Sequence, residues 1–249
     1  MSLPHTQTAP VYVAGGTVQA GGGIYVRRAA DDQLYAACLR GGLAYVLNSR
    51  QVGKSSLMIR AAERLLEEGG RVAIIDFTTM GANLTADDWY RGIVKAVAEQ
   101  LDLGLEGGAW WDFQAGLGAT DRFTRFFREA LERLPGQRIT IFFDEIDTTR
   151  ALPFHGVATD DFFAAMRGLH LERAQNRDMA RLGIVLIGAA TPSDLIENPD
   201  RTPFNLGERI EIADFTEVEA AGLLPGSGIP PEEAQQVLRA VIAWTGIPT

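Results

Sequence analysis

Apolar runs alternate with amphipathic stretches along most of the chain. Five apolar runs predict buried strands, at residues 43–48, 71–77, 138–147, 182–191 and 209–215. Apolar residues at helical spacing predict helices over 54–67, 85–101, 121–134, 160–175, 216–224 and 230–246. This alternation indicates an α/β fold, with a parallel five-stranded sheet covered by helices on both faces. Ligands of such sheets bind beyond the carboxyl ends of the strands, so the chemistry is expected there.

The same pattern divides the chain into three segments. Residues 1–23 are rich in Gly, Thr and Pro and are expected to form a flexible leader. The strands and most helices fall within residues 24–215, the expected core. Residues 216–249 form the expected C-terminal helical segment. A chain of 249 residues is long enough to bury a core without a metal or disulfide staple.

Charge and cysteine content narrow the class of protein. The formal net charge is −9, which disfavours nucleic acid as a partner because phosphate neutralisation needs a basic face. Cys38 is the single cysteine, so no disulfide forms within the chain, and a small buried residue is its expected role. No apolar run reaches the roughly 18 residues of a membrane span, and no signal-peptide pattern opens the sequence. We therefore expect a cytoplasmic protein without a membrane partner.

A phosphate-binding loop is predicted after the first strand, in the stretch NSRQVGKSS at 48–56. The pattern G-x-x-x-x-G-K-[ST] is met except at its first position, where Asn48 replaces glycine. We expect Asn48 to be tolerated, because asparagine adopts a positive φ more readily than other non-glycine residues. The stretch joins a buried strand to an amphipathic helix, as phosphate binding at a helix N-terminus requires. An ordinary strand–loop–helix turn is the alternative.

Each part of this loop has an expected role. Gly53 lets backbone amides approach phosphate, Lys54 reaches the β- and γ-phosphates, and the Ser55 hydroxyl ligates Mg²⁺. Lys54 is thus a candidate for catalysis as well as binding. The candidate nucleotide-binding residues of the loop are Asn48, Ser49, Arg50, Gln51, Val52, Gly53, Lys54, Ser55 and Ser56.

Two carboxylates end the third predicted strand, in the stretch IFFDEID at 141–147. Asp144 is expected to hold Mg²⁺, usually through water, and Glu145 to polarise the attacking water as a general base. An acid that caps a helix at a strand end is the alternative for either residue. The loop and the acid pair together favour a nucleotide site over a chance match.

The fourth strand ends in GAATPSDL, where Thr191 is the candidate sensor of the γ-phosphate. We expect Ser193 to cap the following short helix and to leave Thr191 free; the alternative is that Thr191 belongs to the cap. Arg201 and Arg209 follow, and either is able to stabilise charge on a transferred phosphoryl group. Arg201 is preferred because it lies in a loop, with a plain surface arginine as the alternative.

Five stretches together resemble the AAA-like domain of bacterial signalling proteins, within the STAND class of signal-transduction ATPases. They are YVRRAADDQLYAACLRGGLAYVLNSRQVGKSSL, DEID, DDFFAAMRGLHLERAQN, LIGAATPSDLIENPDRTPFNLGERIEIADF and VIAWTGIPT. The resemblance runs from about Tyr25 to the end. It implies a P-loop NTPase fold with an extra strand between the loop strand and the carboxylate strand. Asparagine is also common at the first loop position of this family, which removes the objection to Asn48.

The resemblance also implies ligands and partners. STAND proteins are switches with an ADP-bound resting form and an ATP-bound, often oligomeric, active form, coupled to sensor and effector domains. The segment YVRRA is similar to the stretch that packs on adenine, which makes Tyr25, Val26 and Arg27 candidates; a buried Val26 beside a surface arginine is the alternative. The closing TGIP is similar to a GxP motif that contacts the nucleotide and leads into a winged helix, with Gly246 and Pro248 matching. The winged helix is expected to be absent from this sequence.

The residues leave four functions open. They are a regulatory ATPase with slow, Mg²⁺-dependent turnover, a nucleotide-binding module without hydrolysis, an origin-recognition-like ATPase acting on DNA, and a small-molecule kinase. Glu145 favours hydrolysis over a pure binding module. The acidic net charge weighs against DNA, and a kinase lid would need more arginines than Arg201 and Arg209.

Overall fold

The structure is a computed structural model, and it describes residues 25–81, 84–154 and 157–222. Beyond these ranges it describes positions 230, 233, 236, 237, 239 and 240. The leader expected over 1–23 and the two matching residues of the GxP motif, Gly246 and Pro248, lie outside the described residues.

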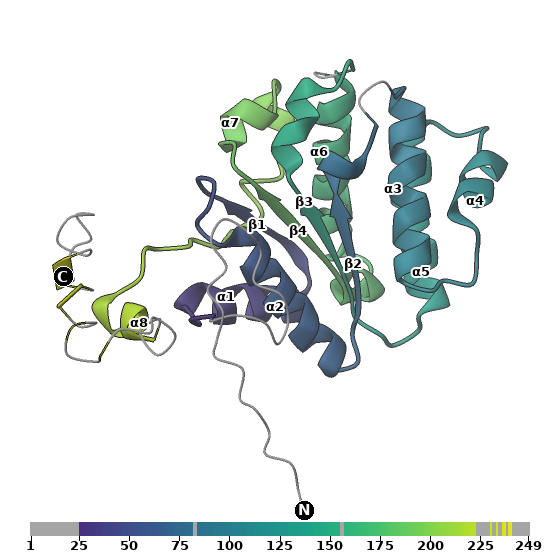
Figure 1. Cartoon of the computed structure of the whole chain (residues 1–249). Coiled ribbons are helices and arrows are strands. Elements are labelled where there is room, and N and C mark those ends of the chain that lie inside the picture. Colours follow the sequence, from purple (N-terminus) through teal and green to yellow (C-terminus); the bar gives the residue numbers. More distant parts are fainter. Residues whose placement is uncertain are drawn as a thin grey trace, which may run out of the picture.

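Five parallel strands form the sheet in the order β2-β3-β4-β1-β5 (Figure 1). The strands are β1 (Gly42–Leu47), β2 (Arg71–Asp76), β3 (Ile139–Asp144), β4 (Leu182–Gly188) and β5 (Glu208–Arg209). This order confirms the predicted parallel sheet, with β4 inserted between the loop strand β1 and the carboxylate strand β3. Asp76 and Asp144 are paired in the register of β2 and β3, so both acids lie at the same edge of the sheet.

Helices cover both faces of this sheet (Figure 1). On one face, α1 and α2 pack on alternate strand residues such as Val46, Phe142 and Val185. On the other face, α3, α5 and α6 pack on the intervening residues, such as Phe143 and Leu186. The helices are α1 (Ala29–Arg40), α2 (Lys54–Glu67), α3 (Ala86–Gln100), α4 (Gly107–Phe113), α5 (Ala119–Arg133), α6 (Val157–Glu172), α7 (Pro192–Leu195) and α8 (Glu217–Ala221). Among the described residues, no helix has the length and apolar character needed to cross a membrane.

Two helices, α1 and α4, were not predicted from the sequence pattern. The helix α4 begins with two glycines, Gly107 and Gly108, which are poor helix formers. Glu106 compensates for them, because its carboxylate accepts hydrogen bonds from the backbone nitrogens of Gly108 and Ala109. Tertiary packing and this cap therefore decide the local structure against propensity.

All five strands end earlier than predicted, and β3, β4 and β5 do so by three residues or more. The strand β3 ends at Asp144 because the next residue, Glu145, has a left-handed backbone with φ of 53°. The strand β4 ends at Gly188, three residues before the predicted boundary. The fifth strand is reduced to two residues, although Ile210 still donates its backbone N–H to the carbonyl of Tyr45 at 2.9 Å. The predicted burial of Cys38 is confirmed.

His170 of α6 accepts a hydrogen bond at the start of β1. Its Nδ1 lies 3.1 Å from the backbone nitrogen of Leu43, and this bond requires a neutral ring. Burial, and secondly the guanidinium of Arg173, lower the pKa of His170. Below about pH 6.5 the unfolded chain binds a proton that the folded chain resists, so the stability contributed at neutral pH is lost on acidification.

We expect His170→Asn to make the domain less sensitive to acid, since the Oδ1 of asparagine is an acceptor that does not titrate. Between about pH 7.5 and about pH 5.5, wild type should lose up to about 1 kcal/mol more free energy of unfolding than the variant. Urea unfolding at both pH values measures this difference. Equal losses in the two proteins would assign the acid sensitivity to other groups.

Candidate phosphate-binding site

The predicted phosphate loop joins β1 to α2 at the carboxyl end of the sheet. Its left-handed residues are Gln51, with φ of 64°, and Gly53, with φ of 95°. A Cβ at Gly53 would lie 2.8 Å from Nη2 of Arg28, so glycine is needed there for space as well as for conformation. This close approach of backbone is the feature that a phosphate cradle requires.

The reason given for Asn48 was wrong, because the structure does not give this residue a positive φ. Its side chain instead forms hydrogen bonds through both of its polar atoms. Nδ2 donates to the carbonyl of Ile212 at 2.9 Å, and Oδ1 accepts from the backbone nitrogen of Ser49 at 2.8 Å. Asn48 therefore attaches the start of the loop to the segment that follows β5.

Lys54 is the first residue of α2 and is 7% exposed. Its ammonium donates to the loop carbonyls of Asn48 at 3.1 Å and Ser49 at 2.7 Å. Burial lowers the pKa of Lys54, while the carboxylates of Glu145, Asp144 and Asp147 act in the opposite direction. The cation thus lies inside the loop with three acids near it.

The two predicted metal ligands are brought together. The hydroxyl of Ser55 donates to Oδ2 of Asp144 at 3.4 Å. Asp144 is 7% exposed, and burial is the main cause that raises its pKa, with Asp76 on the neighbouring strand adding to the rise. A hydroxyl and a carboxylate are oxygen donors suited to Mg²⁺. Ser56, the last predicted loop residue, is buried on α2.

Glu145, like Gln51 of the loop, has a strained backbone. Its φ of 53° and ψ of 43° lie in the left-handed region, which costs a non-glycine residue about 1–2 kcal/mol. Its backbone N–H donates to Oδ1 of Asp144 at 2.9 Å. Burial first, and then Asp147 and Asp144, raise the pKa of Glu145. Strain of this kind is concentrated at functional sites, and a raised carboxylate pKa suits a general base.

Asp147 is a site residue that sequence reasoning missed, although it is the last acid of the DEID motif. It lies in the 3₁₀ turn Ile146–Ala151 that follows Glu145. Its Oδ1 accepts the backbone N–H of Ala189 at 2.9 Å, and its Oδ2 lies 3.8 Å from Nη2 of Arg50. Asp147 therefore connects the 3₁₀ turn in which it lies with the end of β4 and with the phosphate loop.

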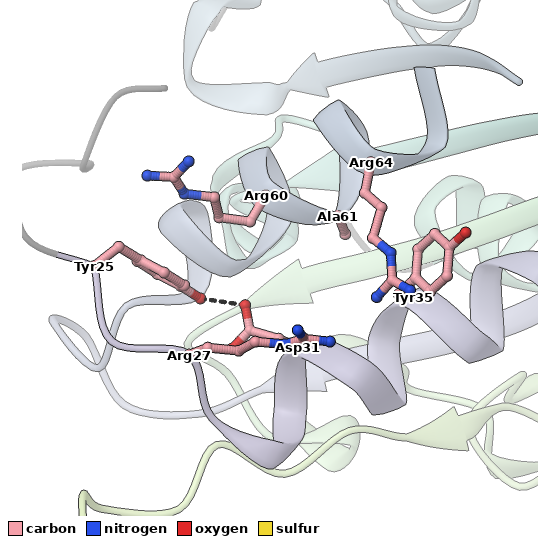
Figure 2. A pocket seen from close by; sticks show the side chains of 7 residues that line it. All are labelled: Tyr25, Arg27, Asp31, Tyr35, Arg60, Ala61 and Arg64. Carbon is pink, nitrogen blue, oxygen red and sulfur yellow. Dashed lines mark hydrogen bonds between the residues drawn. The ribbon is translucent and has the colours of Figure 1, made fainter. Parts of the chain in front are cut away.

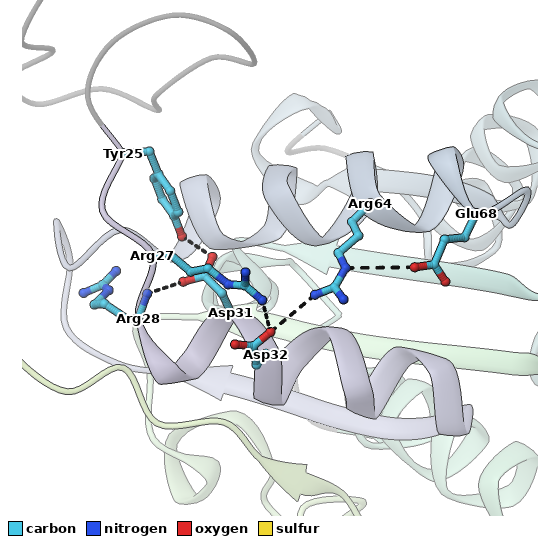
Figure 3. Close-up of polar contacts among 7 residues, drawn as sticks. All are labelled: Tyr25, Arg27, Arg28, Asp31, Asp32, Arg64 and Glu68. Atoms are coloured by element: carbon cyan, nitrogen blue, oxygen red, sulfur yellow. Dashed lines mark hydrogen bonds and ion pairs between the residues drawn. The ribbon is translucent and has the colours of Figure 1, made fainter. Parts of the chain in front are cut away.

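Arg28 is a second residue that was missed. It is 9% exposed, and its Nη2 donates to the carbonyl of Val52 at 3.0 Å. Its guanidinium also lies 4.7 Å from the centre of the Phe215 ring, while its Nε is buried without a hydrogen-bond partner. Figure 3 shows Arg28 apart from the ion pairs that its neighbour Arg27 joins. Arg28, the N-cap of α1, thus holds the phosphate loop in place through its hydrogen bond to Val52.

Tyr25 and Arg27, two of the predicted adenine contacts, face the groove between α1 and α2. The Tyr25 hydroxyl donates to Oδ1 of Asp31 at 2.5 Å, and Arg27 pairs with Asp32 (Figure 3). Both residues line a cavity of about 440 Å³ whose other walls come from α1 and α2 (Figure 2). The described walls of this cavity contain no residue of the phosphate loop.

Val26, the third predicted adenine contact, packs near Gly222, the C-cap of α8, and does not line this cavity. A Cβ built on Gly222 would be 3.2 Å from its Cγ2. Val26 is half-buried. The role of these three residues toward adenine stays a prediction.

Thr191 is not left free, so the expectation that Ser193 caps the next helix was wrong. Thr191 is itself the N-cap of α7, where its hydroxyl donates to Oδ2 of Asp194 at 2.6 Å and its backbone N–H donates to the same oxygen at 2.9 Å. Pro192 at the first helical position favours this register, because its fixed φ suits the first turn.

The two candidate arginines are both engaged elsewhere. Arg201 forms a half-buried ion pair with Asp161 of α6. Arg209 lies on β5, is exposed, and has its Nη2 3.7 Å from Oε1 of Glu211. By contrast, Arg50 of the phosphate loop lies 3.8 Å from Asp147 at the site itself. The preference for Arg201 stays a prediction.

Comparison with known proteins shows the family. The model of the family described as the AAA-like domain matches residues 13–244. The chain belongs to the AAA-like domain family. This confirms the AAA-like part of the resemblance drawn from the sequence, while membership of the STAND class stays a prediction.

One relative of this AAA-like domain is an uncharacterized WD repeat-containing protein of Synechocystis sp. The two are 37% identical over 251 residues, which cover 99% of this chain and 21% of that protein. The chain therefore spans about a fifth of the length of this relative.

Solved structures show the fold of the AAA-like domain. The Walker-type ATPase PABY2304 of Pyrococcus abyssi is similar with a TM-score of 0.54 and 16% identity, over 86% of this chain and 63% of that one. DnaA of Aquifex aeolicus bound to AMPPCP gives a TM-score of 0.48 and 13% identity, over 90% of this chain and 63% of that one. With its sheet order and loop, the domain has the P-loop NTPase fold.

Proposed function

We propose that this AAA-like domain binds Mg–ATP and hydrolyses it slowly, as the nucleotide switch of a STAND-type signal-transduction ATPase. The observation that carries the proposal is the meeting of Lys54, Ser55 and Asp144 at the carboxyl edge of the sheet. The Ser55 hydroxyl and the Asp144 carboxylate are 3.4 Å apart. The ammonium of the buried Lys54 interacts electrostatically with Asp144 and also with Glu145. This set of groups matches the chemistry of phosphoryl transfer from a magnesium–nucleotide complex.

The residues present fit both ligands. Among the described residues no group of three or more His, Cys, Asp or Glu side chains is arranged to hold a metal ion. A cation shared by Ser55 and Asp144 would therefore be completed by phosphate oxygens and water, which is the usual coordination of Mg²⁺ in nucleotide sites. Bound Mg²⁺ supplies charge neutralisation to the phosphates. Close backbone approach at Gly53 suits the phosphates themselves.

The chain's own residues supply the remaining steps. Lys54 exchanges the carbonyls of Asn48 and Ser49 for phosphate oxygens, which are stronger acceptors because they are charged. Glu145 takes a proton from the attacking water, and its raised pKa makes it a stronger base for this step. The strained backbone of Glu145 fixes where that carboxylate stands relative to Asp144.

Slow turnover and a switch role are supported by hydrogen bonds and an ion pair that the candidate catalytic side chains make with other residues of the domain. Lys54 is bonded to its own loop, Thr191 is bonded in a helix cap, and Arg201 is paired with Asp161. Each of these contacts has to change before the group reaches a nucleotide. A domain of this kind changes state between nucleotide forms rather than turning over rapidly.

The partners in this proposal follow from the family and its relative. The WD repeat-containing relative from Synechocystis sp. supports a repeat array as the sensor, with an effector and a nucleotide-dependent homo-oligomer as further partners. We place the protein in the cytoplasm. Adenine is proposed to lie near Tyr25, Val26 and Arg27, with Pro248 closing the site.

Calorimetric titration with Mg–ATP, Mg–ADP and Mg–GTP, paired with a phosphate-release assay, tests the proposal. We expect adenine-selective binding with release on the order of one phosphate per minute or slower, far below the roughly 10 s⁻¹ of a median enzyme. Binding without any release would favour the nucleotide-binding module instead. No binding of any nucleotide to this folded domain would reject the proposed function.

A further inference from the structure

Arg50 presents a guanidinium on the phosphate loop itself. It is the third residue of the loop, and its side chain is 80% exposed. Its Nη2 lies 3.8 Å from Oδ2 of Asp147, which is an ion-pair distance but longer than a hydrogen bond. An exposed pair at this separation is weak. Arg50 is therefore held near Asp147 without being locked there.

Asp147, in contrast, is fixed in place. Its side chain is 13% exposed, and its Oδ1 accepts the backbone N–H of Ala189 at 2.9 Å. A Cβ at Gly188 would lie 2.9 Å from that same oxygen, so the strand end is fitted closely around the carboxylate. When the ion pair between Arg50 and Asp147 breaks, the Arg50 side chain is consequently the one that moves, and Asp147 stays in place.

The charge of Arg50 acts on both chemical groups of the site. Its charge adds to the lowering of the pKa of Lys54, which burial mainly causes, and opposes the rise in the pKa of Glu145. The guanidinium therefore lies within electrostatic reach of the cation that binds phosphate and of the proposed base. The other two candidate arginines have acidic partners outside this group of residues, Arg201 with Asp161 and Arg209 with Glu211.

We infer that Arg50 contacts the terminal phosphate of a bound nucleoside triphosphate in cis, and that Asp147 holds it when that phosphate is absent. The inference rests on the proposed function. It assigns to the Arg50 side chain a role beyond the backbone contacts expected of a loop residue. A phosphate oxygen competes well for a guanidinium because it offers charge-assisted, bidentate hydrogen bonds, whereas Asp147 offers a long and exposed pair.

The pair then discriminates a triphosphate from a diphosphate. Binding of a third phosphate moves Arg50 off Asp147, and a diphosphate leaves the pair intact. The Oδ1 of Asp147 also accepts the backbone N–H of Ala189, which lies two residues before Thr191, the N-cap of α7. When Arg50 leaves Oδ2 of Asp147, the change therefore reaches the start of α7 through this hydrogen bond. Arg50 and Asp147 are thus the first place where the two nucleotide states differ.

Equilibrium binding of ADP and of a non-hydrolysable ATP analogue to three variants tests this inference. Arg50→Ala should weaken the analogue about 10-fold and leave ADP within about 2-fold of wild type. Asp147→Asn keeps an acceptor for Ala189 but removes the ion pair, so it should tighten the analogue about 3-fold. In the double variant the effect of Asp147→Asn should vanish, because it acts through Arg50.

The double variant separates this inference from a general effect of charge. If Asp147→Asn still tightens the analogue when Arg50 is absent, the carboxylate repels phosphate directly and the inference is overturned. An unchanged ratio of analogue to ADP affinity in Arg50→Ala overturns it as well. Arg50→Lys should recover part of the ratio, since the charge is kept and the fork geometry is lost. Arg125→Ala, at an exposed arginine of α5, is the matched control and should change neither affinity.

The proposed function fails separately from this inference. Wild type that binds neither nucleotide overturns both. Wild type that binds both nucleotides, with Arg50→Ala behaving like wild type, overturns the role of Arg50 alone. Because the Arg50 side chain is 80% exposed, the variant is expected to fold, and urea unfolding that superimposes on wild type confirms that the comparison is valid.

Discussion

Lys54→Ala is expected to lower the affinity for Mg–ATP by at least about 100-fold, because it removes two or more charge-assisted hydrogen bonds worth about 1.5–3 kcal/mol each. The Lys54 residue is 7% exposed, and its ammonium already lies inside the loop, bonded to the carbonyls of Asn48 and Ser49. Removing it also takes one cation away from Asp144, Glu145 and Asp147, so their charges repel phosphate more strongly. Calorimetric titration measures the loss.

The chain offers a close control for this variant, since Lys54 and Lys95 are its two lysines. Lys95 is exposed on α3, where its Nζ lies 3.9 Å from Oε1 of Glu99. Lys95→Ala changes the net charge equally and should leave nucleotide affinity within about 2-fold of wild type. Retained micromolar affinity in Lys54→Ala, with Lys95→Ala unchanged, would reject the assignment of the phosphate loop.

Glu145→Gln is expected to keep nucleotide binding and to slow phosphate release by about 100- to 10,000-fold, which is the usual contribution of a general base. The amide is nearly isosteric with the carboxylate but does not accept the proton of the attacking water. The hydrogen bond from the Glu145 backbone to Asp144 is retained. Titration and phosphate release, measured on the same sample, separate the binding step from the chemical step.

The pH dependence gives a second readout on Glu145. Its pKa is raised by burial and by Asp147 and Asp144. The base works only when deprotonated, so phosphate release should rise with pH through this raised pKa and then level off. In Glu145→Gln that rise should disappear. Glu99→Gln, an exposed glutamate on α3, is the control; turnover that survives in Glu145→Gln would place the base elsewhere.

The sheet was predictable because β1, β2, β3 and β4 are largely apolar runs, as strands covered on both faces must be, whereas β5 is two exposed charged residues. The order of acids and loop along the chain then placed Lys54, Ser55, Asp144 and Glu145 at one edge. The boundary of β3 was not predictable in the same way. The stretch IFFDEID returns to an apolar residue at Ile146, so the pattern does not mark the strand end, which the left-handed backbone of Glu145 sets at Asp144.

The errors came from contacts between residues distant in sequence. Asn48 was judged by its backbone conformation, but its amide has a partner 164 residues away in Ile212. Asp147 was overlooked because its partner Ala189 lies on another strand end, 42 residues on. Local chemistry alone was also ambiguous, as Thr191 and Ser193 are both good caps and the structure uses Thr191.

Two hydrogen bonds join the ends of the phosphate loop to the segments on either side of the core. Where the chain enters the core, Arg28 is bonded to Val52; where it leaves, Ile212 is bonded to Asn48. The five consecutive loop residues 48–52 therefore lie between one contact to each flank. A ligand that rearranges these five residues would change both contacts at once, so occupancy of the loop and the position of the two flanking segments are linked.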